Sequence, residues 1–560
     1  MKFIRILGDK RGIATFIALM IMVMLTMIGL AALKLANDEI DIAGNELNEM
    51  ASFYSAEAGL ESASAAMQSS YETTGAPPVT LPVGNITFND CNVAYKTVDN
   101  GAAVHRELTS GSLAGLNALV KTYTIKSMST SQVDASEIEL TQEFECAQIP
   151  LFQFAVFYTE MLQTSPAYGM TIDGRVHVNS DMWLNGWNGL TFTDKVTCAG
   201  KIRHGLENGA ESGAPANVYF RDEDNNSINW KQGGQWLDAD ASNWYDSSSA
   251  RWDGWVSDEA YGQEELNLPL SNSGDPHKII ERGSGNSDSY EHKATLKIMD
   301  GVPYAKMGTV WQDISGMLPA GTITAAGTTA DFTDGHEEKT IKNTQVDLGL
   351  LQSSGYYPSN GVIYVSDQRS ATSTTMNGVT LANGTDLGAP LTLASENPVY
   401  VEGDYNTVDK QPASIIADAC TFLSNDWAST NKAKSHLNYN YRPVSTSTTA
   451  NVSIVTGDLN PSSSNYGGGL ENLPRFLEHW GGKTFQYRGS MICLWKSQIA
   501  NGTYKYKGSP GYYSAPTRDW GFDHDLEDPS KLPPETPVVR AFQRVRWQQS
   551  DISYRENYSN

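Results

Sequence analysis

Uncharged and charged positions divide the start of the chain into two blocks. From Ile13 to Leu33 no residue carries a charge. Four basic residues precede this run: Lys2, Arg5, Lys10 and Arg11. About 21 residues of α-helix are roughly 31 Å long, which is enough to cross the hydrocarbon core of a bilayer. The pattern therefore predicts a membrane-spanning helix whose basic, leader side faces the cytoplasm.

The apolar pattern then takes on helical spacing. Between Asn37 and about Ser69 there is no proline, and apolar residues recur three or four positions apart: Ile40, Ala43, Leu47, Met50, Tyr54 and Ala58. Such spacing forms one apolar stripe along a helix, and acidic residues occupy much of the remaining surface. We predict one continuous helix over residues 13–72, half in lipid and half outside. A membrane anchor needs only the first half, so the second half is expected to pack against other copies or against a head domain.

Residues 79–150 show the alternation that is typical of strands. Runs such as NITF, NVAYKTV, KTYTIKSM and SEIELTQEFEC place apolar and polar residues in turn. In the last run, Glu137, Glu139, Glu143 and Glu145 face outward while their neighbours face inward. The pattern predicts an antiparallel sheet of about four strands that packs on the apolar stripe of the helix.

Shorter strands follow beyond Pro150. From Met170 to about Ile202, turn residues separate apolar pairs, which are Val176/Val178, Met182/Leu184, Leu190/Phe192 and Val196/Cys198. Such pairs are typical of a parallel β-helix, although no strict repeat period emerges. We expect a β-helix-like domain to begin over residues 151–203. We expect an insertion rich in Trp, Asp and Asn over 204–345, and the remainder of the β-rich head over 346–560, with a short amphipathic helix at Leu473–Trp480.

The predicted fold class is therefore α+β, mainly β. A long N-terminal helix leads into an antiparallel sheet, and parallel β-helix-like rungs follow.

The segment RGIATFIALMIMVMLTMIGLAALKLANDEIDIAGNELNEMASFYSAEAGLESA resembles the PilX-type N-terminus of type IV pilus minor pilins. The residues that carry the resemblance are Arg11 and Gly12 before the apolar run, Thr26 and Gly29 within it, Ala43, Gly44 and Asn45 in the middle, and the closing AEAGL with Glu57 and Gly59. The head resembles a recurrent extension of such proteins in stretches such as GRVHVNSDMWL, NPVYVEGDYN and GGLENLPRFLEHW.

The resemblance implies a pilin-like fold and a defined maturation. Residues 1–12 would be a basic prepilin leader that a prepilin peptidase removes between Gly12 and Ile13. The mature chain would sit in the bacterial inner membrane with its head outside the cytoplasm. It would then join a filament by packing its helix against other pilins, with the help of the inner-membrane assembly platform.

Ile17 departs from the pattern of shaft-forming pilins. Major pilins carry Glu at the fifth mature position, where the carboxylate pairs with the N-terminal amine of a neighbouring subunit. An apolar side chain at Ile17 offers no such pairing, and an unpaired charge in hydrocarbon is costly. A head of about 490 residues spans roughly 60 Å, whereas packed helices lie about 8–10 Å apart. Both features predict a rare or filament-end subunit.

Composition limits the partners. The net charge is -24, and removal of the leader, with four positive charges and one negative charge, leaves about -27. Nucleic-acid binding is dominated by basic contacts to phosphates, so we expect no nucleic-acid partner. An acidic surface of this kind suits an extracytoplasmic, soluble head.

The five cysteines are few and odd in number. Cys91 and Cys146 share strand phase with inward-facing residues, so they would face the core in an oxidising compartment. A Cys91–Cys146 disulfide is one expectation, and two buried thiols are the alternative. Cys198, Cys420 and Cys493 have no CxxC spacing, so a zinc site is not expected.

Motifs for catalysis are missing from the sequence. HExxH, GxSxG, a Walker loop and GxGxxG after a strand do not occur, and we expect no enzyme. Asp519, Asp523 and Asp525 lie in the densest acidic cluster and are weak candidates for calcium ligands. A solvated acidic loop is the favoured alternative, and no other cofactor is expected.

The function that the sequence favours is structural. We expect a minor pilin or pseudopilin-like subunit that inserts in the inner membrane and joins or caps a filament. The alternative is a filament-tip adhesin that binds a surface or a glycan through the head, because five tryptophans crowd the insertion: Trp230, Trp236, Trp244, Trp252 and Trp255. The ordinary interpretation of these tryptophans is that they fill a small core. A glycan-degrading enzyme is a third hypothesis, since parallel β-helices host such enzymes.

Overall fold

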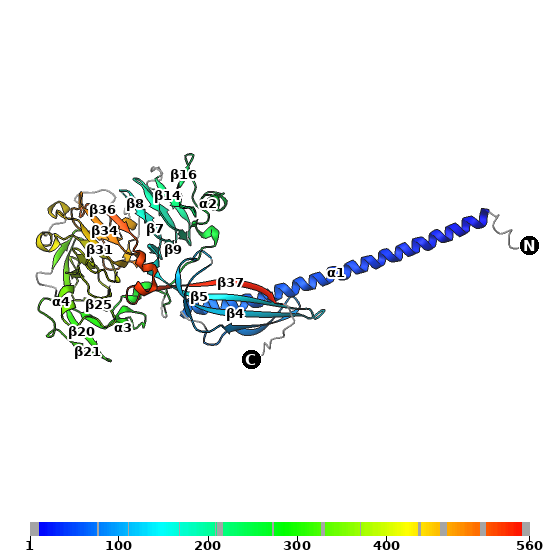
Figure 1. Cartoon of the computed structure of the whole chain (residues 1–560), viewed down its shortest axis with the longest axis horizontal. Helices are drawn as coiled ribbons and strands as arrows, with labels where there is room; N and C mark the ends of the chain where they lie inside the picture. The colour runs from blue at the N-terminus through cyan, green and yellow to red at the C-terminus, as the bar shows by residue number, and fades with distance from the viewer. Residues whose placement is uncertain are drawn as a thin grey trace, which may run out of the picture.

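A computed structural model describes residues 10–550, apart from 75–77, 110, 167, 208, 210–216, 271–273, 326–330, 370, 435–437, 460–466 and 505–510. The molecule consists of a long helical stem and a β-rich head (Figure 1). The stem helix α1 (Lys10–Thr74) is 65 residues long, or about 97 Å. The predicted long helix is confirmed, while residues 1–9 of the predicted leader lie outside the described residues.

An antiparallel sheet lies against the last third of α1 (Figure 1). Its path is β1–β2–β4–β5–β37, and β3 pairs with β4. The strands are β1 (Val83–Phe88), β2 (Cys91–Asp99), β3 (Val104–Glu107), β4 (Asn117–Ser131), β5 (Glu137–Pro150) and β37 (Val538–Ser550). Inward Ile138, Leu140 and Phe144 are buried while the four glutamates of β5 are half-buried on the other face. The predicted alternation in this sheet is confirmed.

The sheet contains one strand that the sequence placed elsewhere. β37 pairs antiparallel with β5, from Val538 opposite Pro150 to Ser550 opposite Glu139. The assignment of all residues 346–560 to the head therefore needs correction, because 538–550 return to the stem. The head is consequently inserted between two neighbouring strands of the stem sheet.

The head is a parallel β-helix, as predicted. Its first coils place β6 (Val156–Tyr158), β9 (Val176–Val178) and β12 (Val196–Cys198) on one face. The second face has β7 (Leu162–Thr164), β10 (Met182–Leu184) and β13 (Ile202–His204), and the third has β8 (Met170–Ile172), β11 (Leu190–Phe192) and β14 (Val218–Arg221). Parallel pairing joins residues 156, 176 and 196, residues 162, 182 and 202, and residues 170 and 190. The expectation that no strict period exists is wrong, because these offsets are all 20 residues.

A second group of coils continues the same stack. One face consists of β25 (Val362–Ser366), β27 (Leu391–Ser395), β29 (Ala413–Ala417), β32 (Ser453–Asp458) and β35 (Met491–Lys496). The next has β24 (Lys339–Asp347), β26 (Thr375–Ala382), β28 (Val399–Glu402), β30 (Cys420–Leu423) and β33 (Pro474–Phe476), and the last has β31 (Thr448–Asn451), β34 (Thr484–Arg488) and β36 (Thr517–Gly521). β33 is thus a strand where the amphipathic helix at Leu473–Trp480 was expected.

The chain enters and leaves this stack in its middle. It starts at β6, builds outward through β9 and β12, and resumes at the opposite end with β19 (Leu296–Met299), which pairs with β25. The coils then return until β35 pairs in parallel with β6. A single hydrophobic core runs through the stack and onto the adjoining part of the stem sheet. Figure 1 accordingly shows coils on both sides of the point where the stem enters the head.

The predicted insertion at 204–345 is not a single unit. β14 and β18 (Val256–Ser257) pair with β11 and β12, so they belong to the third coil. Between and after them lie short elements: β15 (Ser227–Asn229), β16 (Lys231–Gln232), β17 (Gln235–Trp236), α2 (Trp244–Trp252), α3 (Tyr290–Lys293), β20 (Val302–Met307), β21 (Val310–Asp313), β22 (Ile323–Thr324) and β23 (Phe332–Asp334). A further short helix, α4 (Leu348–Ser353), follows β24.

Candidate functional site

The free part of α1 is a long exposed surface of the described chain. Every residue from Gly12 to Leu47 is exposed, including the apolar side chains of the predicted membrane segment. One apolar window of this helix is long enough to span a membrane. The predicted cleavage point between Gly12 and Ile13 lies in the first turn of α1, and Ile17 is 50% exposed.

Thr26 and Gly29 lie within the apolar run without breaking the helix. Thr26 donates its hydroxyl to the carbonyl of Met22 at 2.7 Å, four residues earlier. A Cβ at Gly29 would meet nothing within 4 Å. Among the described residues neither of the two packs against another element.

The predicted apolar stripe does not face the sheet. Ile40, Leu47, Met50 and Tyr54 are 68, 68, 55 and 52% exposed. The motif residues Ala43, Gly44 and Asn45 are also exposed. The prediction that the sheet packs on this stripe is wrong. At 100° of rotation per residue, the stripe lies on the opposite side of α1 from the residues that contact the sheet.

Small residues form the face of α1 that contacts the sheet. Its buried residues are Ser52, Ser55, Ala56, Gly59, Leu60, Ala63, Ser64 and Met67. A Cβ at Gly59 would lie 2.2 Å from Ser127 Oγ and 2.7 Å from Val93 Cγ1. Ser127 and Val93 of the sheet lie directly under Gly59, so a larger residue at this position would prevent the close approach. Gly59 of the AEAGL motif therefore has a packing role, whereas Glu57 is exposed.

The C-terminal strand fixes the helix to the sheet. Arg544 of β37 forms a two-pronged ion pair with Glu61 of α1, in which Nη2 and Oε2 are 2.7 Å apart. This hydrogen bond from Arg544 lowers the pKa of Glu61. Phe542 stacks on Phe144 at 5.0 Å between ring centroids. The sequence offered no local signal for these contacts, because β37 lies far from the helix along the chain.

Hydrogen bonds join the stem sheet to the head where β5 ends and β37 begins. The amide of Leu151 donates to the carbonyl of Pro537 at 2.9 Å. Asn117 and Gln153 exchange two hydrogen bonds of 2.8 and 2.6 Å. Arg175 donates to the carbonyl of Ala114 at 2.6 Å. The head is therefore held to the stem by two chain crossings and by side-chain contacts.

The predicted disulfide is ruled out by the register of the stem sheet. Cys91 lies opposite Ser131 on β4, and Cys146 lies opposite Lys121. These β4 positions are ten residues apart (131 − 121), or about 33 Å, whereas bridged cysteines have Cα atoms about 4–7 Å apart. All five cysteines are free and buried. Burial raises the pKa of Cys146 to about 12.

The candidate calcium residues are engaged with cations of the chain itself. Lys410 Nζ lies 2.9 Å from Asp523 Oδ1 and 2.7 Å from Asp525 Oδ2. Asp525 also contacts Lys531 at 2.7 Å, and hydrogen bonds from both lysines lower its pKa to about 2. Asp519 pairs instead with Arg488 at 2.8 Å. Within the described residues no group of three or more His, Cys, Asp or Glu side chains is arranged to hold a metal ion.

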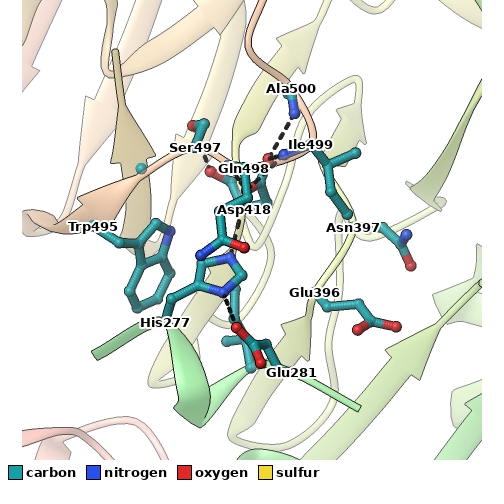
Figure 2. Close-up of polar contacts among 12 residues, drawn as sticks. His277, Glu281, Glu396, Asn397, Asp418, Trp495, Ser497, Gln498, Ile499 and Ala500 are labelled. Atoms are coloured by element: carbon teal, nitrogen blue, oxygen red, sulfur yellow. Dashed lines mark hydrogen bonds and ion pairs between the residues drawn. The ribbon is translucent and has the colours of Figure 1, made fainter. Parts of the chain in front are cut away.

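A buried histidine between two carboxylates is a feature that the sequence did not point to. His277 is 3% exposed, and its ring lies between Glu281 and Asp418 (Figure 2). Nδ1 is 2.8 Å from Glu281 Oε1, and Nε2 is 3.5 Å from Asp418 Oδ1. Asp418 is fully buried and accepts hydrogen bonds from the backbone amides of residues 498–500.

The charges around His277 decide its protonation. Burial acts to lower the pKa of His277, but hydrogen bonds and charge from Asp418 and Glu281 outweigh it, so the pKa is raised. The ring edge meets Trp495 at 5.5 Å between centroids. This arrangement ties residues 276–281 to two coils of the stack, and its burial suits a structural ion pair.

The crowded tryptophans are core residues, as their ordinary interpretation predicts, but they belong to the main core of the head and not to a small core of their own. Trp230 and Trp252 are 0% exposed and Trp244 is 3% exposed. Trp236 and Trp255 are partly buried and pack against the same core. These side chains therefore do not form an aromatic binding surface.

A hollow of about 1180 Å³ lies where the stem sheet, the first coils and residues 261–268 meet. Lys121 and Arg540 line it from the sheet, and Glu160 and Glu264 line it from the head. The mixture of positive and negative groups does not select one charge class of ligand.

Comparison with known proteins adds little to this geometry. No family model and no curated protein matches the chain. Among solved structures, the competence-associated pilin ComZ from Thermus thermophilus is similar to it, with 12% identity and a TM-score of 0.23 over 90% of this chain and 97% of that chain. A likeness of that size carries no argument about function.

Proposed function

We propose that this chain is a membrane-anchored structural subunit of a type IV pilus-like filament or pseudopilus. In this proposal α1 inserts in the bacterial inner membrane and then packs among the helices of other pilins, while the head stays outside the cytoplasm. The observation that supports it most is the division of α1 into a free apolar part and a part packed on its own sheet.

The free apolar part needs a partner. Fourteen large apolar side chains between Ile13 and Leu33 are exposed. Burying each contributes about 1.5–3 kcal/mol, or roughly 20–40 kcal/mol together. A folded domain has a net stability of only about 5–15 kcal/mol. Lipid supplies such burial first, and neighbouring helices in a filament supply it after extraction from the membrane.

Processing is the second element of the proposal. A prepilin peptidase would cut between Gly12 and Ile13, leaving the apolar run at the new N-terminus. Removal of the leader takes away the basic residues that hold that end at the cytoplasmic face. Thr26 satisfies its hydroxyl within the helix, so it can be buried in lipid without an unpaired polar group.

Two features support a position at the end of the filament or as a rare subunit. Ile17 supplies no carboxylate for the amine of a neighbour. The head sheet that contains β6 has 12 strands, and eleven spacings of about 4.8 Å make it roughly 53 Å wide. The stem enters at β6, the fourth strand from one edge, so the sheet extends about 14 Å to one side and about 38 Å to the other. Heads on adjacent helices about 8–10 Å apart would therefore overlap.

The proposal is tested by blocking the cleavage. Gly12→Leu should leave the leader attached and remove the protein from the sheared filament fraction, whereas Gly8→Leu, in the same leader, should leave both unchanged. Immunoblotting of membrane and filament fractions gives the readout. If Gly12→Leu protein enters filaments as well as wild type does, processing at this position is not required and the proposal fails.

Binding of a surface or a glycan by the head stays a prediction, and we assign no residues to it. The burial of Trp230, Trp244 and Trp252 removes the aromatic surface on which it was based. We therefore give the structural role precedence.

A further inference from the structure

The neck of the stem, residues 34–51, is a helix surface that the described residues leave uncovered except at its lower end. It lies between the apolar run and the part of α1 that contacts the sheet, and it is about 27 Å long. Only Asn48 and Ala51 are half-buried in it. Asn48 donates to Asp134 Oδ2 at 3.1 Å, which ties the lower end of the neck to the sheet.

One side of the neck is apolar although it lies outside the predicted membrane segment. Ile40, Leu47, Met50 and Tyr54 form this stripe and are more than half exposed. Beside the stripe, the ring of Phe53 lies 5.7 Å from the ring of Tyr54 and 5.8 Å from the ring of Trp547 on β37. Trp547 is itself 48% exposed. The stripe is opposite to the face of α1 that packs on the sheet, and none of the described residues covers it.

The rest of the neck is strongly acidic. It carries Asp38, Glu39, Asp41, Glu46 and Glu49 against a single Lys34, so its net charge is -4 (one minus five). Within the described residues none of these five carboxylates forms an ion pair. Glu39 and Glu46 are seven residues apart, so they follow one edge of the stripe at successive double turns.

We propose that the neck binds an amphipathic helix of a different protein, whose own apolar stripe is bordered by Lys or Arg, in preference to a second copy of this chain. This inference rests on the proposed function and names the chemistry of the neighbouring subunit. Two necks side by side would bring ten carboxylates and two lysines together (2 × 5 and 2 × 1). At a helix separation of about 8–10 Å, salt at physiological strength screens such charges only partly. A basic border converts that repulsion into ion pairs.

The test uses the full-length chain in zwitterionic detergent micelles and two labelled synthetic helices. Both peptides are about five turns long with the same leucine stripe, but one is bordered by Lys and the other by Glu. We expect the Lys-bordered peptide to bind at least about tenfold more tightly by fluorescence anisotropy, and less tightly at high salt. Energy transfer between two labelled copies of the chain measures self-association in the same micelles.

Variants separate the two parts of the neck surface. Glu39→Lys/Glu46→Lys, at the edge of the stripe, should invert the peptide preference, and Leu47→Gln/Met50→Gln should weaken both peptides. Glu223→Lys/Asp224→Lys, a charge change at an exposed turn of the head, should alter neither. Equal binding of the two peptides, unchanged binding by the Leu47/Met50 variant, or self-association as tight as peptide binding would each overturn the inference. Should that happen while wild type is still processed at Gly12 and recovered with filaments, the proposed function stands and only the partner chemistry fails.

Discussion

The C-terminal and N-terminal parts of α1 differ in whether the described chain supplies a packing partner. From Ser52 to Met67 the helix meets a partner within its own chain, and the contact face consists mostly of Ser, Ala and Gly. From Ile13 to Leu33 it meets no partner, and the exposed residues are mostly Ile, Leu, Met and Val. Small residues allow a close approach to the sheet of the same chain. Large apolar residues contribute more free energy when another molecule buries them. The residue sizes along one helix therefore indicate where its partner is located.

The largest expected effect concerns the free part. Leu25→Asp places a carboxylate in the middle of the apolar run and should weaken membrane insertion by at least about 3 kcal/mol. Leu47→Asp, the same change in the neck, should leave insertion unchanged because that surface is in water. Alkaline extraction of membranes compares the two. Equal release of both variants would contradict the boundary between membrane segment and neck.

The interior of the head contrasts with the free helix, because even a buried histidine, His277, has two carboxylates beside it there. His277→Gln should destabilise the head by about 2–3 kcal/mol, because Glu281 and Asp418 lose the charge between them. The folded pKa of His277 lies above its ordinary value. Its contribution is therefore complete below about pH 6.5 and is lost as pH rises through the raised pKa. Urea unfolding as a function of pH should show this alkaline decline in wild type and not in the variant.

His177 gives the matched contrast within the same stack. It is 1% exposed and bonded to Thr197 at 2.8 Å and Asn179 at 3.0 Å, without a carboxylate. Burial lowers the pKa of His177 to about 4. Its contribution is complete above about pH 6.5 and is lost as pH falls toward 4. A stability profile that keeps rising above pH 7 would contradict the His277 assignment.

Substitution of one glycine in the packed part of α1 and one in the neck tests the contact with the sheet. Gly59→Ala should destabilise the contact with the sheet by about 1–2 kcal/mol, because its Cβ would meet Ser127 and Val93. Gly44→Ala should be neutral or stabilising by about 0.5–1 kcal/mol, since nothing lies near it. Hydrogen exchange of residues 52–71 is the measurement. Similar protection in both variants would show that the close approach is not required.

The smallest effect is expected at the surface tie between the helix and β37. Arg544→Met should cost only about 0.5–1 kcal/mol, because the two side chains of the Glu61–Arg544 pair are about half exposed. The pKa of Glu61 is lowered, so the contribution of the pair is present above the ordinary Glu value and is lost as pH falls through the lowered one. Unfolding of the variant should lose that acid dependence, and Arg546→Met serves as the control on the same strand.

The sequence predicted elements whose signal is local and missed relations between distant elements. Alternation in β5 and the uninterrupted helix were recognisable because each is encoded within the element. β37 could not be assigned to the stem, since its partner β5 ends 388 residues earlier (538 − 150). Strand phase placed Cys91 and Cys146 on inward faces, but phase does not give the register along β4 that separates them.

The 20-residue repeat of the first coils and the packed face of α1 both have a signal in the sequence. The strings VFYTEMLQTSPAYGMTIDGR and VHVNSDMWLNGWNGLTFTDK are consecutive and equally long, and their buried strand residues align. The repeat is hidden because only three residues per strand are constrained while the turns vary. Hydrophobicity alone indicates that the apolar stripe packs on the sheet, but the structure packs the opposite face of small residues there. The Ser, Ala and Gly residues that recur between Ser52 and Ser64 indicate the packed face better than the apolar stripe does.

The measurement that tests the central claim most directly is the mass of the N-terminal peptide of the protein recovered from sheared filaments. We predict a peptide that begins at Ile13, in a fraction that also contains other pilins. A peptide that retains residues 1–12, or recovery of the protein only from the soluble fraction with its N-terminus intact, would contradict the assignment of the free part of α1 to membrane insertion and filament assembly.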